Sequence, residues 1–242
     1  MTTYFIMTAI VIFIIGLGKG GLGGTLGVLA TPLMTLVMPA DQVIGLLLPI
    51  LIIADIFAVY SHWLHWDKKL VLLLIPGAVI GMLMASFFIA GISPEMLRRG
   101  IGVIVLLFVL YKLLEKRILS AYYKPRGWHG LVAGIVGGIT STLAHTGGPP
   151  IAIYLLMQNI SPRVFVATSA LFFAILNWIK VPSYYYLGLF DFNLLWQIAW
   201  LLPLLPLSVW LGKLLTTKVN KVLFDRIIIG LLAFTALFLL FE

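Results

Sequence analysis

Long apolar runs are the feature that most constrains how this chain can fold. The chain is 62% hydrophobic and only 10% charged, with a mean hydropathy of +1.14, so it has too few polar side chains to cover a soluble domain of its length. A helix needs about 20 apolar residues to cross a bilayer. We therefore expect an all-α polytopic membrane protein, with spans at residues 42–61, 70–90, 97–114, 163–181, 193–213 and 222–240.

Two further apolar segments, residues 4–38 and 128–158, are interrupted by glycine, proline and small polar residues. As one continuous helix, residues 4–38 would be about 52 Å long, too long for a hydrocarbon core of about 30 Å. Each segment is therefore expected to break. It forms either a re-entrant hairpin with two arms of about half the membrane thickness, or a tilted, broken helix that crosses fully.

The distribution of basic residues favours the hairpins. If both segments cross fully, Lys and Arg are divided almost evenly between the two sides. If both are re-entrant, one side keeps only Arg98, Arg99 and Lys180, and the other receives the basic residues of all remaining loops. The positive-inside rule then places both termini outside the cell and the linker 115–127 in the cytoplasm. The net charge of +8 indicates contact with membrane lipid, not nucleic acid.

The two halves of the chain resemble each other weakly. Each begins with a broken segment and continues with a span that contains one polar residue, and an offset of 122 (177 minus 55) places Asp55 on Asn177. One hairpin plus three spans makes an odd number of crossings, so the second half would be inverted relative to the first. We predict two inverted repeats, residues 1–114 and 128–242, each a hairpin followed by three spans.

Non-helical backbone inside a membrane must be buried in protein or line a wet cavity. We expect the two breaks to meet near the bilayer centre, where the second arm of each hairpin starts a helix. Free N–H groups and the positive end of the dipole at such helix starts favour an anion, and glycines let it approach the backbone closely. The predicted substrate-binding residues are Gly18, Lys19, Gly20, Gly21, Gly23, His145, Thr146, Gly147, Gly148 and Asn177.

The charged residues of these segments leave alternatives open. Lys19 binds or gates an anion, pairs permanently with Asp55, or reaches the membrane interface. Asp55 is either the partner of Lys19, a buried acid or a proton-coupling residue. His145 is either a hydrogen-bonded core residue or a substrate contact, and Asn177 offers an amide donor.

Other functions have weaker support. The run Gly18–Gly21 lacks the remainder of a nucleotide-binding loop. His62 and His65 lie beside tryptophans in a loop, which is typical of a membrane interface, so we expect no metal site and no cofactor. An intramembrane enzyme needs a convergent base and nucleophile, and only Asp55 and His145 are deep candidates, so we expect no enzyme. A non-transporting membrane subunit would leave Lys19 and the paired breaks unexplained.

The lysine-containing glycine run 16–24, the later Pro32 and the motif His145-Thr-Gly-Gly-Pro-Pro150 resemble the sulfite exporter TauE/SafE family over nearly the whole chain. The resemblance implies a bacterial inner-membrane transporter for a small anion, sulfite or an organosulfonate, and implies that Gly18 to Gly23 and His145 to Pro150 hold the substrate. We expect export by alternating access. A proton-coupled permease for a different small anion is the alternative, and a homo-oligomer is left open.

Overall fold

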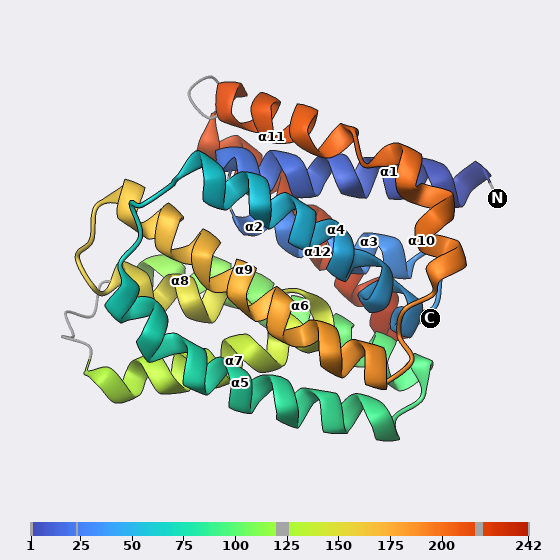
Figure 1. Cartoon of the computed structure of the whole chain (residues 1–242), viewed down its shortest axis with the longest axis horizontal. Helices are drawn as coiled ribbons and strands as arrows, with labels where there is room; N and C mark the ends of the chain where they lie inside the picture. The colour runs from blue at the N-terminus through green and yellow to red at the C-terminus, as the bar shows by residue number, and fades with distance from the viewer. Residues whose placement is uncertain (1, 23, 120–125, 216–219, 242) are drawn as a thin grey trace.

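The computed structural model describes residues 2–22, 24–119, 126–215 and 220–241, and these ranges contain helices and connections but no strand (Figure 1). The all-α fold is therefore confirmed. The elements are α1 (Thr2–Leu17), the π-helical turn η1 (Gly18–Leu22), α2 (Gly24–Val28), α3 (Ala30–Thr35), α4 (Ala40–Ser61), α5 (Lys68–Gly91), α6 (Pro94–Leu119), α7 (Gly127–Ala144), α8 (Gly148–Leu156), α9 (Pro162–Tyr186), α10 (Phe192–Ile198), the short turn η2 (Ala199–Leu201), α11 (Leu204–Leu215) and α12 (Lys221–Phe241).

Several helices are long and apolar enough to cross a bilayer, as expected for a multi-pass membrane protein. They are Thr3–Gly21, Ala40–Ser61, Lys68–Gly91, Pro162–Tyr186 and Leu223–Phe241. Helix α6, which covers the predicted span 97–114, is not among them, although it has 26 residues. Arg98, Arg99 and Lys112 fall inside that span and shorten its uncharged part.

The predicted span 193–213 is a bent pair of helices that together are long and apolar enough to form one span. It divides into α10, η2 and α11, and the two parts are bent by 52°. Pro203 lies at the bend, where its missing N–H removes one helical hydrogen bond and its ring collides with the preceding turn.

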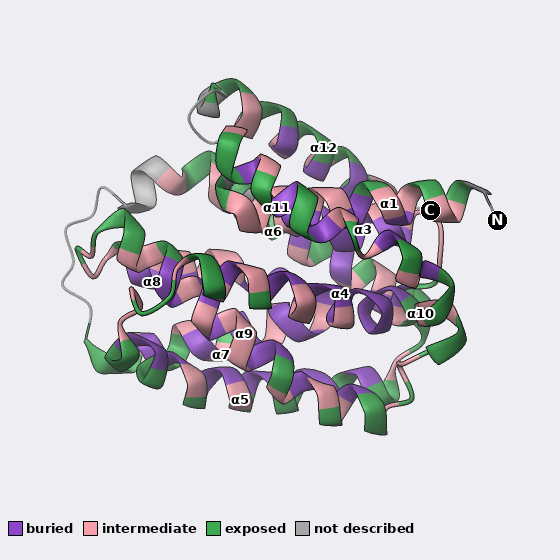
Figure 2. Ribbon diagram, turned by 45° about the horizontal axis from the view of Figure 1, so that its top comes forward, coloured by how far each residue is buried: buried purple, intermediate pink, exposed green. Residues whose placement is uncertain are grey.

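Two hydrophobic cores divide most of the helices into two bundles. The first bundle consists of α1, α3, α4 and α10–α11, and the second consists of α5, α7, α8 and α9. Figure 1 shows α1 and α11 along one side of the molecule and α5 and α7 along the opposite side. Helix α4 lies between them with much of its surface buried (Figure 2). A third core joins α6 and α12 to both bundles.

Small residues allow the outer helix pairs to pack with their backbones in close contact. In α5 and α7, a Cβ atom on any of four glycines would overlap the backbone of the facing helix; these are Gly77, Gly81, Gly134 and Gly138. The segment α1–η1 packs on α11 in the same way, because Gly20 of η1 faces Val209 O and Gly212 of α11 faces Leu17 O. Small residues four apart are a common device for close helix packing in membranes.

Both broken segments fold back on themselves. Thr8 Oγ1 lies 3.9 Å from Met34 Sδ, so α3 returns alongside α1. A Cβ on Gly137 would lie 2.8 Å from Ile151 Cδ1, so α8 returns alongside α7. The first arms are longer than half a membrane, since α1 has 16 residues and α7 has 18, about 24 and 27 Å. Both chain ends lie at one end of the molecule (Figure 1).

Candidate functional site

The first break lies at η1, where the helix of α1 ends in a π-helical turn. Gly21 has a φ of 128°, a conformation that glycine adopts without steric cost. Gly20 touches α11 so closely that a Cβ atom would overlap the carbonyl oxygen of Val209. Gly18 and Lys19 belong to the same turn, whereas Gly23 lies outside the described residues. The glycines thus bring the lysine-bearing turn against α11 and end the helix there.

Lys19 forms an ion pair with Asp55 of α4, through Nζ and Oδ1. The Asp55 side chain is 1% exposed and that of Lys19 is 22% exposed. Asn177 Nδ2 of α9 donates a hydrogen bond of 2.6 Å to Asp55 Oδ2. Both carboxylate oxygens therefore have partners, and the pairing alternative for Lys19 is the arrangement present in this structure.

A phenyl ring lies between the two breaks. Lys19 Nζ is 5.5 Å from the centre of the Phe173 ring, a cation–π distance. A Cβ on Gly147 would lie 3.2 Å from Phe173 Cε1, so the same ring also touches the second break. Helices α2 and α8, which follow the two breaks, contact each other as well. The two interrupted stretches are thus neighbours across α9.

The second break is held by hydrogen bonds at the end of α7. His145 has a left-handed backbone (φ 52°), its N–H donates to Ser141 O (3.0 Å), and the Thr146 N–H donates to Thr140 O (3.2 Å). The Thr146 hydroxyl also donates to Thr140 O, over 3.3 Å. Two such bonds around a left-handed residue form a common helix C-cap, where glycine is usual and histidine is unusual.

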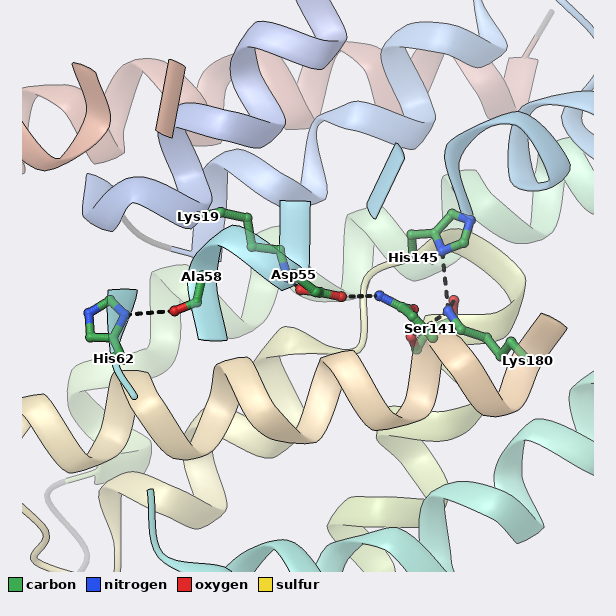
Figure 3. Close-up of polar contacts among 8 residues, drawn as sticks. Lys19, Asp55, Ala58, His62, Ser141, His145 and Lys180 are labelled. Atoms are coloured by element: carbon green, nitrogen blue, oxygen red, sulfur yellow. Dashed lines mark hydrogen bonds and ion pairs between the residues drawn. The ribbon is translucent and has the colours of Figure 1, made fainter. Parts of the chain in front are cut away.

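The His145 ring connects three helices. Nε2 lies 3.0 Å from the carbonyl oxygen of Ile44 in α4, which can only accept, so Nε2 carries the proton. Nδ1 is then an acceptor, and Lys180 Nζ of α9 lies 3.3 Å from it. These contacts fix the left-handed residue in place and extend the line of polar side chains seen in Figure 3.

Helix α8 begins directly after this cap. Its N-cap is Gly147, no side chain caps it, and prolines follow in the first turn. A residue with a side chain does not fit at position 147, because its Cβ atom would lie 2.6 Å from Gly137 O. Gly148 has open space where a Cβ would be, with no heavy atom of the described residues within 4 Å. The start of α8 therefore combines a tightly packed glycine with an uncrowded one.

Lys180 is a site residue that the sequence analysis misplaced. It was counted among the basic residues of the outer side, at the end of the predicted span 163–181, but it is fully buried in α9 and donates to Ser141 O (3.2 Å), Ser141 Oγ (3.1 Å) and His145 Nδ1. Helix α9 continues through Pro182 to Tyr186 because Tyr184 is buried and its hydroxyl donates to Thr142 O, 2.6 Å away. The sequence contains one indication that Lys180 belongs to the site. Lys180 follows Asn177 by three residues, so the two side chains lie on the same face of a helix.

The histidines near the loop after α4 interact with backbone carbonyl groups. His62 Nδ1 lies 3.0 Å from Ala58 O, and His65 Nδ1 lies 2.6 Å from Trp63 O. Asp67 caps α5 by accepting from the N–H groups of Lys69 and Leu70. Among the described residues, no group of three or more His, Cys, Asp or Glu side chains could hold a metal ion.

An apolar groove of about 440 Å³ lies between α6, α7 and α8. It reaches Thr146 and Pro149 at the second break, but its described lining includes neither Lys19 nor Asp55. The groove is therefore adjacent to the polar site and separate from its charged part.

Replacing Asn177 with alanine is expected to lower the free energy of unfolding by about 1–3 kcal/mol, because a buried carboxylate oxygen loses its donor. Asn177→Asp should cost more, since two carboxylates would then face each other. Thermal unfolding of the detergent-purified protein measures both effects. An unchanged unfolding temperature for Asn177→Asp would show that the two side chains are not in contact.

The comparisons with known proteins agree with this architecture. The model of the family described as "Sulfite exporter TauE/SafE" matches residues 8–239, a range that includes both breaks, Asp55, Asn177 and Lys180. Neither the curated proteins nor the solved structures gave a match. Because the family match extends over nearly the whole chain, the chain belongs to the sulfite exporter TauE/SafE family.

Proposed function

We propose that this protein exports a small sulfur oxyanion, either sulfite or an organosulfonate, by alternating access, and that Lys19 binds the anion. The observation that carries the proposal is an ammonium group among membrane helices that is paired but still 22% exposed. An ammonium has three N–H donors, and among the described residues the Lys19 ammonium hydrogen-bonds to Asp55 alone. The remaining donors are available to sulfur-bound oxygens.

Further donors for the anion come from the two breaks. Gly21 in η1 and Gly148 at the start of α8 offer backbone that carries no side chain, and a Cβ built on Gly148 would have no heavy atom of the described residues within 4 Å. The N-terminus of a helix favours negative charge, and α8 has no side-chain cap that would compete for its amides. Lys19 supplies the charge in this proposal, and the break amides, with Thr146, supply directional hydrogen bonds.

The site lies between the two bundles, which suits alternating access. Asp55 belongs to the first bundle and Asn177 to the second, and His145 of the second bundle contacts Ile44 of the first. These polar contacts between bundles can be exchanged for contacts with a substrate when the bundles part. A site shared by two rocking units is a recurring transporter design.

The helix contacts also support inverted repeats. If α1, α3, α4, α6 and α11 correspond to α7, α8, α9, α12 and α5, the contact α1–α11 maps onto α7–α5. The pairs α4–α9 and α6–α12 each map onto themselves, as a two-fold relation requires. Residues 1–114 and 128–242 would then form the two repeats, with each bundle receiving one helix from the other repeat.

The membrane potential can drive the proposed export. In the orientation that we propose, both termini face outward from the inner membrane and the linker 115–127 faces the cytoplasm. Moving one negative charge out of a cell with a negative interior releases about 2.3 kcal/mol per 100 mV. Sulfite carries up to two such charges near neutral pH. No second energy source is required.

A proton-coupled permease for another small anion is the second candidate. The observation that favours it is the burial of Asp55, whose carboxylate would lose the Lys19 ammonium when that group turns to a substrate. A proton taken up by Asp55 would then travel with the anion. Export driven by voltage alone needs no such proton.

Flux measurements in proteoliposomes test the proposal. We expect labelled sulfite to leave vesicles at a rate that increases with an outside-positive potential when the pH is equal on both sides. Flux that follows an imposed pH gradient and ignores voltage would instead support the permease. Vesicles containing the purified, folded protein that carry neither sulfite nor a short sulfonate would contradict the exporter proposal.

A further inference from the structure

We infer that the apolar groove between α6, α7 and α8 binds the hydrocarbon tail of an alkyl- or arylsulfonate whose head group lies at the second break. This inference rests on the proposed function, because it names the class of organosulfonate that the same site would carry. The groove has a volume of about 440 Å³, which lies within the range of about 300–1,000 Å³ that is common for small-molecule sites. Its described lining contains no Lys, Arg, Asp or Glu side chain.

The groove has a buried floor and exposed sides. Phe108 of α6, Tyr154 of α8 and Thr146 belong to its lining and are at most 6% exposed. Val132 and Val136 of α7 also line the groove and are 46% and 44% exposed. An apolar tail that leaves water and lies on this floor gains the free energy of burying its own surface. The groove can therefore contribute affinity that an oxyanion alone does not use.

One end of the groove coincides with the second break. Thr146 and Pro149 line the groove, and between them in the chain lie Gly147 and Gly148, where α8 begins. A Cβ built on Gly148 would have no heavy atom of the described residues within 4 Å, so the backbone is uncovered at this point. An anion held at the start of α8 would thus lie directly beside apolar space.

The shape of a sulfonate requires such a space. Its three oxygens occupy three corners of a tetrahedron around sulfur, and its carbon substituent occupies the fourth corner, where sulfite has a lone pair. When the oxygens face Lys19 and the amides of the second break, the carbon substituent points away from the ammonium. The groove is suitably placed to receive it, because its described lining includes neither Lys19 nor Asp55.

The groove follows α7 away from the break. Its lining residues on this helix extend from Thr140 back to Trp128, which are 12 residues apart (140 minus 128), or about 18 Å along the helix. A tail of several carbons or an aromatic ring can follow this path. An amino or carboxylate group at the far end of the tail would lose its hydration without gaining a charged partner from the lining. We therefore expect a preference for sulfonates with apolar tails.

A series of alkanesulfonates that compete with labelled sulfite in proteoliposomes tests the tail site. A fully buried methylene increases affinity about fourfold, so a groove that is open along one side should give about twofold. From methanesulfonate to hexanesulfonate, the concentration that halves sulfite flux should fall about thirtyfold. Both anions are added on the same side of the membrane, and flux through protein-free vesicles is subtracted.

A matched pair of sulfonates tests the apolar character of the groove. Propane-1-sulfonate and 2-aminoethanesulfonate have chains of the same length, but the second ends in an ammonium group. We expect propane-1-sulfonate to inhibit sulfite flux at a concentration at least about tenfold lower, because the groove offers the ammonium no charged partner. Equal inhibition by the two compounds would contradict an apolar tail site.

Variants that fill the groove distinguish a bound tail from one that dissolves in the bilayer. Val136→Phe and Val132→Phe each add bulk to its side, and either should reduce the thirtyfold gain to about threefold or less. Leu131→Phe is the matched control, since Leu131 is also exposed on α7 but lies outside the described lining. It should keep the full gain. Each concentration is compared with that of methanesulfonate in the same variant, so a changed rate of sulfite flux cancels.

The outcomes separate this inference from the exporter proposal. Sulfite flux with equal inhibition by all chain lengths overturns the tail site, leaves the exporter proposal standing and assigns the groove to membrane lipid. The tail site is also overturned if both groove variants keep the gain of the Leu131→Phe control, because the tails then act through the bilayer. Absence of sulfite flux contradicts the exporter proposal and, with it, a tail site beside the anion.

Discussion

Replacing Lys19 with alanine is expected to reduce sulfite efflux at least about a hundredfold, because charge-assisted hydrogen bonds to the anion contribute about 1.5–3 kcal/mol each and the variant removes all of them. The same change leaves the buried Asp55 carboxylate with Asn177 as its remaining hydrogen-bond donor. Removing one member of a buried ion pair costs about 3–5 kcal/mol of stability. The partial exposure of Lys19 places the expected loss at the lower end of that range.

A double variant separates the loss of the charge from the loss of the fold. Lys19→Ala combined with Asp55→Asn removes both charges and lets the new amide accept from Asn177. We expect this double variant to unfold close to the temperature of the unaltered protein and still to carry no sulfite. Transport restored in the double variant would mean that the pair is structural and that Lys19 does not bind the substrate.

Replacing Gly138 with leucine is expected to prevent recovery of folded protein. A Cβ atom at this position would overlap the carbonyl oxygen of Ala78 and lie 2.9 Å from its Cα. Overpacking usually lowers the free energy of unfolding by about 1–3 kcal/mol, and by more where the overlapping atoms belong to the backbone of a neighbouring helix, which cannot move away as a side chain can. Because α5 and α7 touch along several glycines, the second bundle would have to separate. The yield of monodisperse protein in detergent measures the effect.

Gly230 in α12 is the matched control for that substitution. No heavy atom of the described residues lies within 4 Å of a Cβ built on it, and it is exposed on a helix that is long and apolar enough to cross a membrane. Gly230→Leu should therefore unfold within about 0.5 kcal/mol of the unaltered protein. Equal losses for the two leucine variants would contradict the close packing of α5 on α7.

The sequence predicted the apolar helices at residues 42–61, 70–90, 163–181 and 222–240 for a physical reason. Apolar runs of membrane length are visible without tertiary information, and so is a polar residue inside such a run. The register aligned Asp55 with Asn177 as equivalent positions, and the structure adds a direct hydrogen bond between them, which was not predicted. This contact agrees with the proposed two-fold relation, because side chains close to such an axis face their own counterparts.

The positions of Lys180, Tyr184 and Phe173 depend on tertiary contacts, which the sequence does not reveal. Lys180 was counted on the outer side because it stands at the end of the predicted span 163–181, yet α9 stays helical through Pro182 to Tyr186 and the Tyr184 side chain is buried. Tyr184 begins a run of three tyrosines; it is buried, whereas Tyr185 and Tyr186 are exposed. The contact of Phe173 with both breaks could not be predicted, since a phenylalanine inside an apolar span carries no distinguishing pattern.

Equilibrium binding of sulfite to the purified protein tests the central claim most directly. Ligand that binds only the folded state raises the unfolding temperature in a saturable manner. At constant ionic strength set with chloride, sulfite should raise the unfolding temperature of the unaltered protein and leave that of the Lys19→Ala/Asp55→Asn variant unchanged. An equal rise in both proteins, or no rise in the unaltered one, would show that the anion does not bind at Lys19.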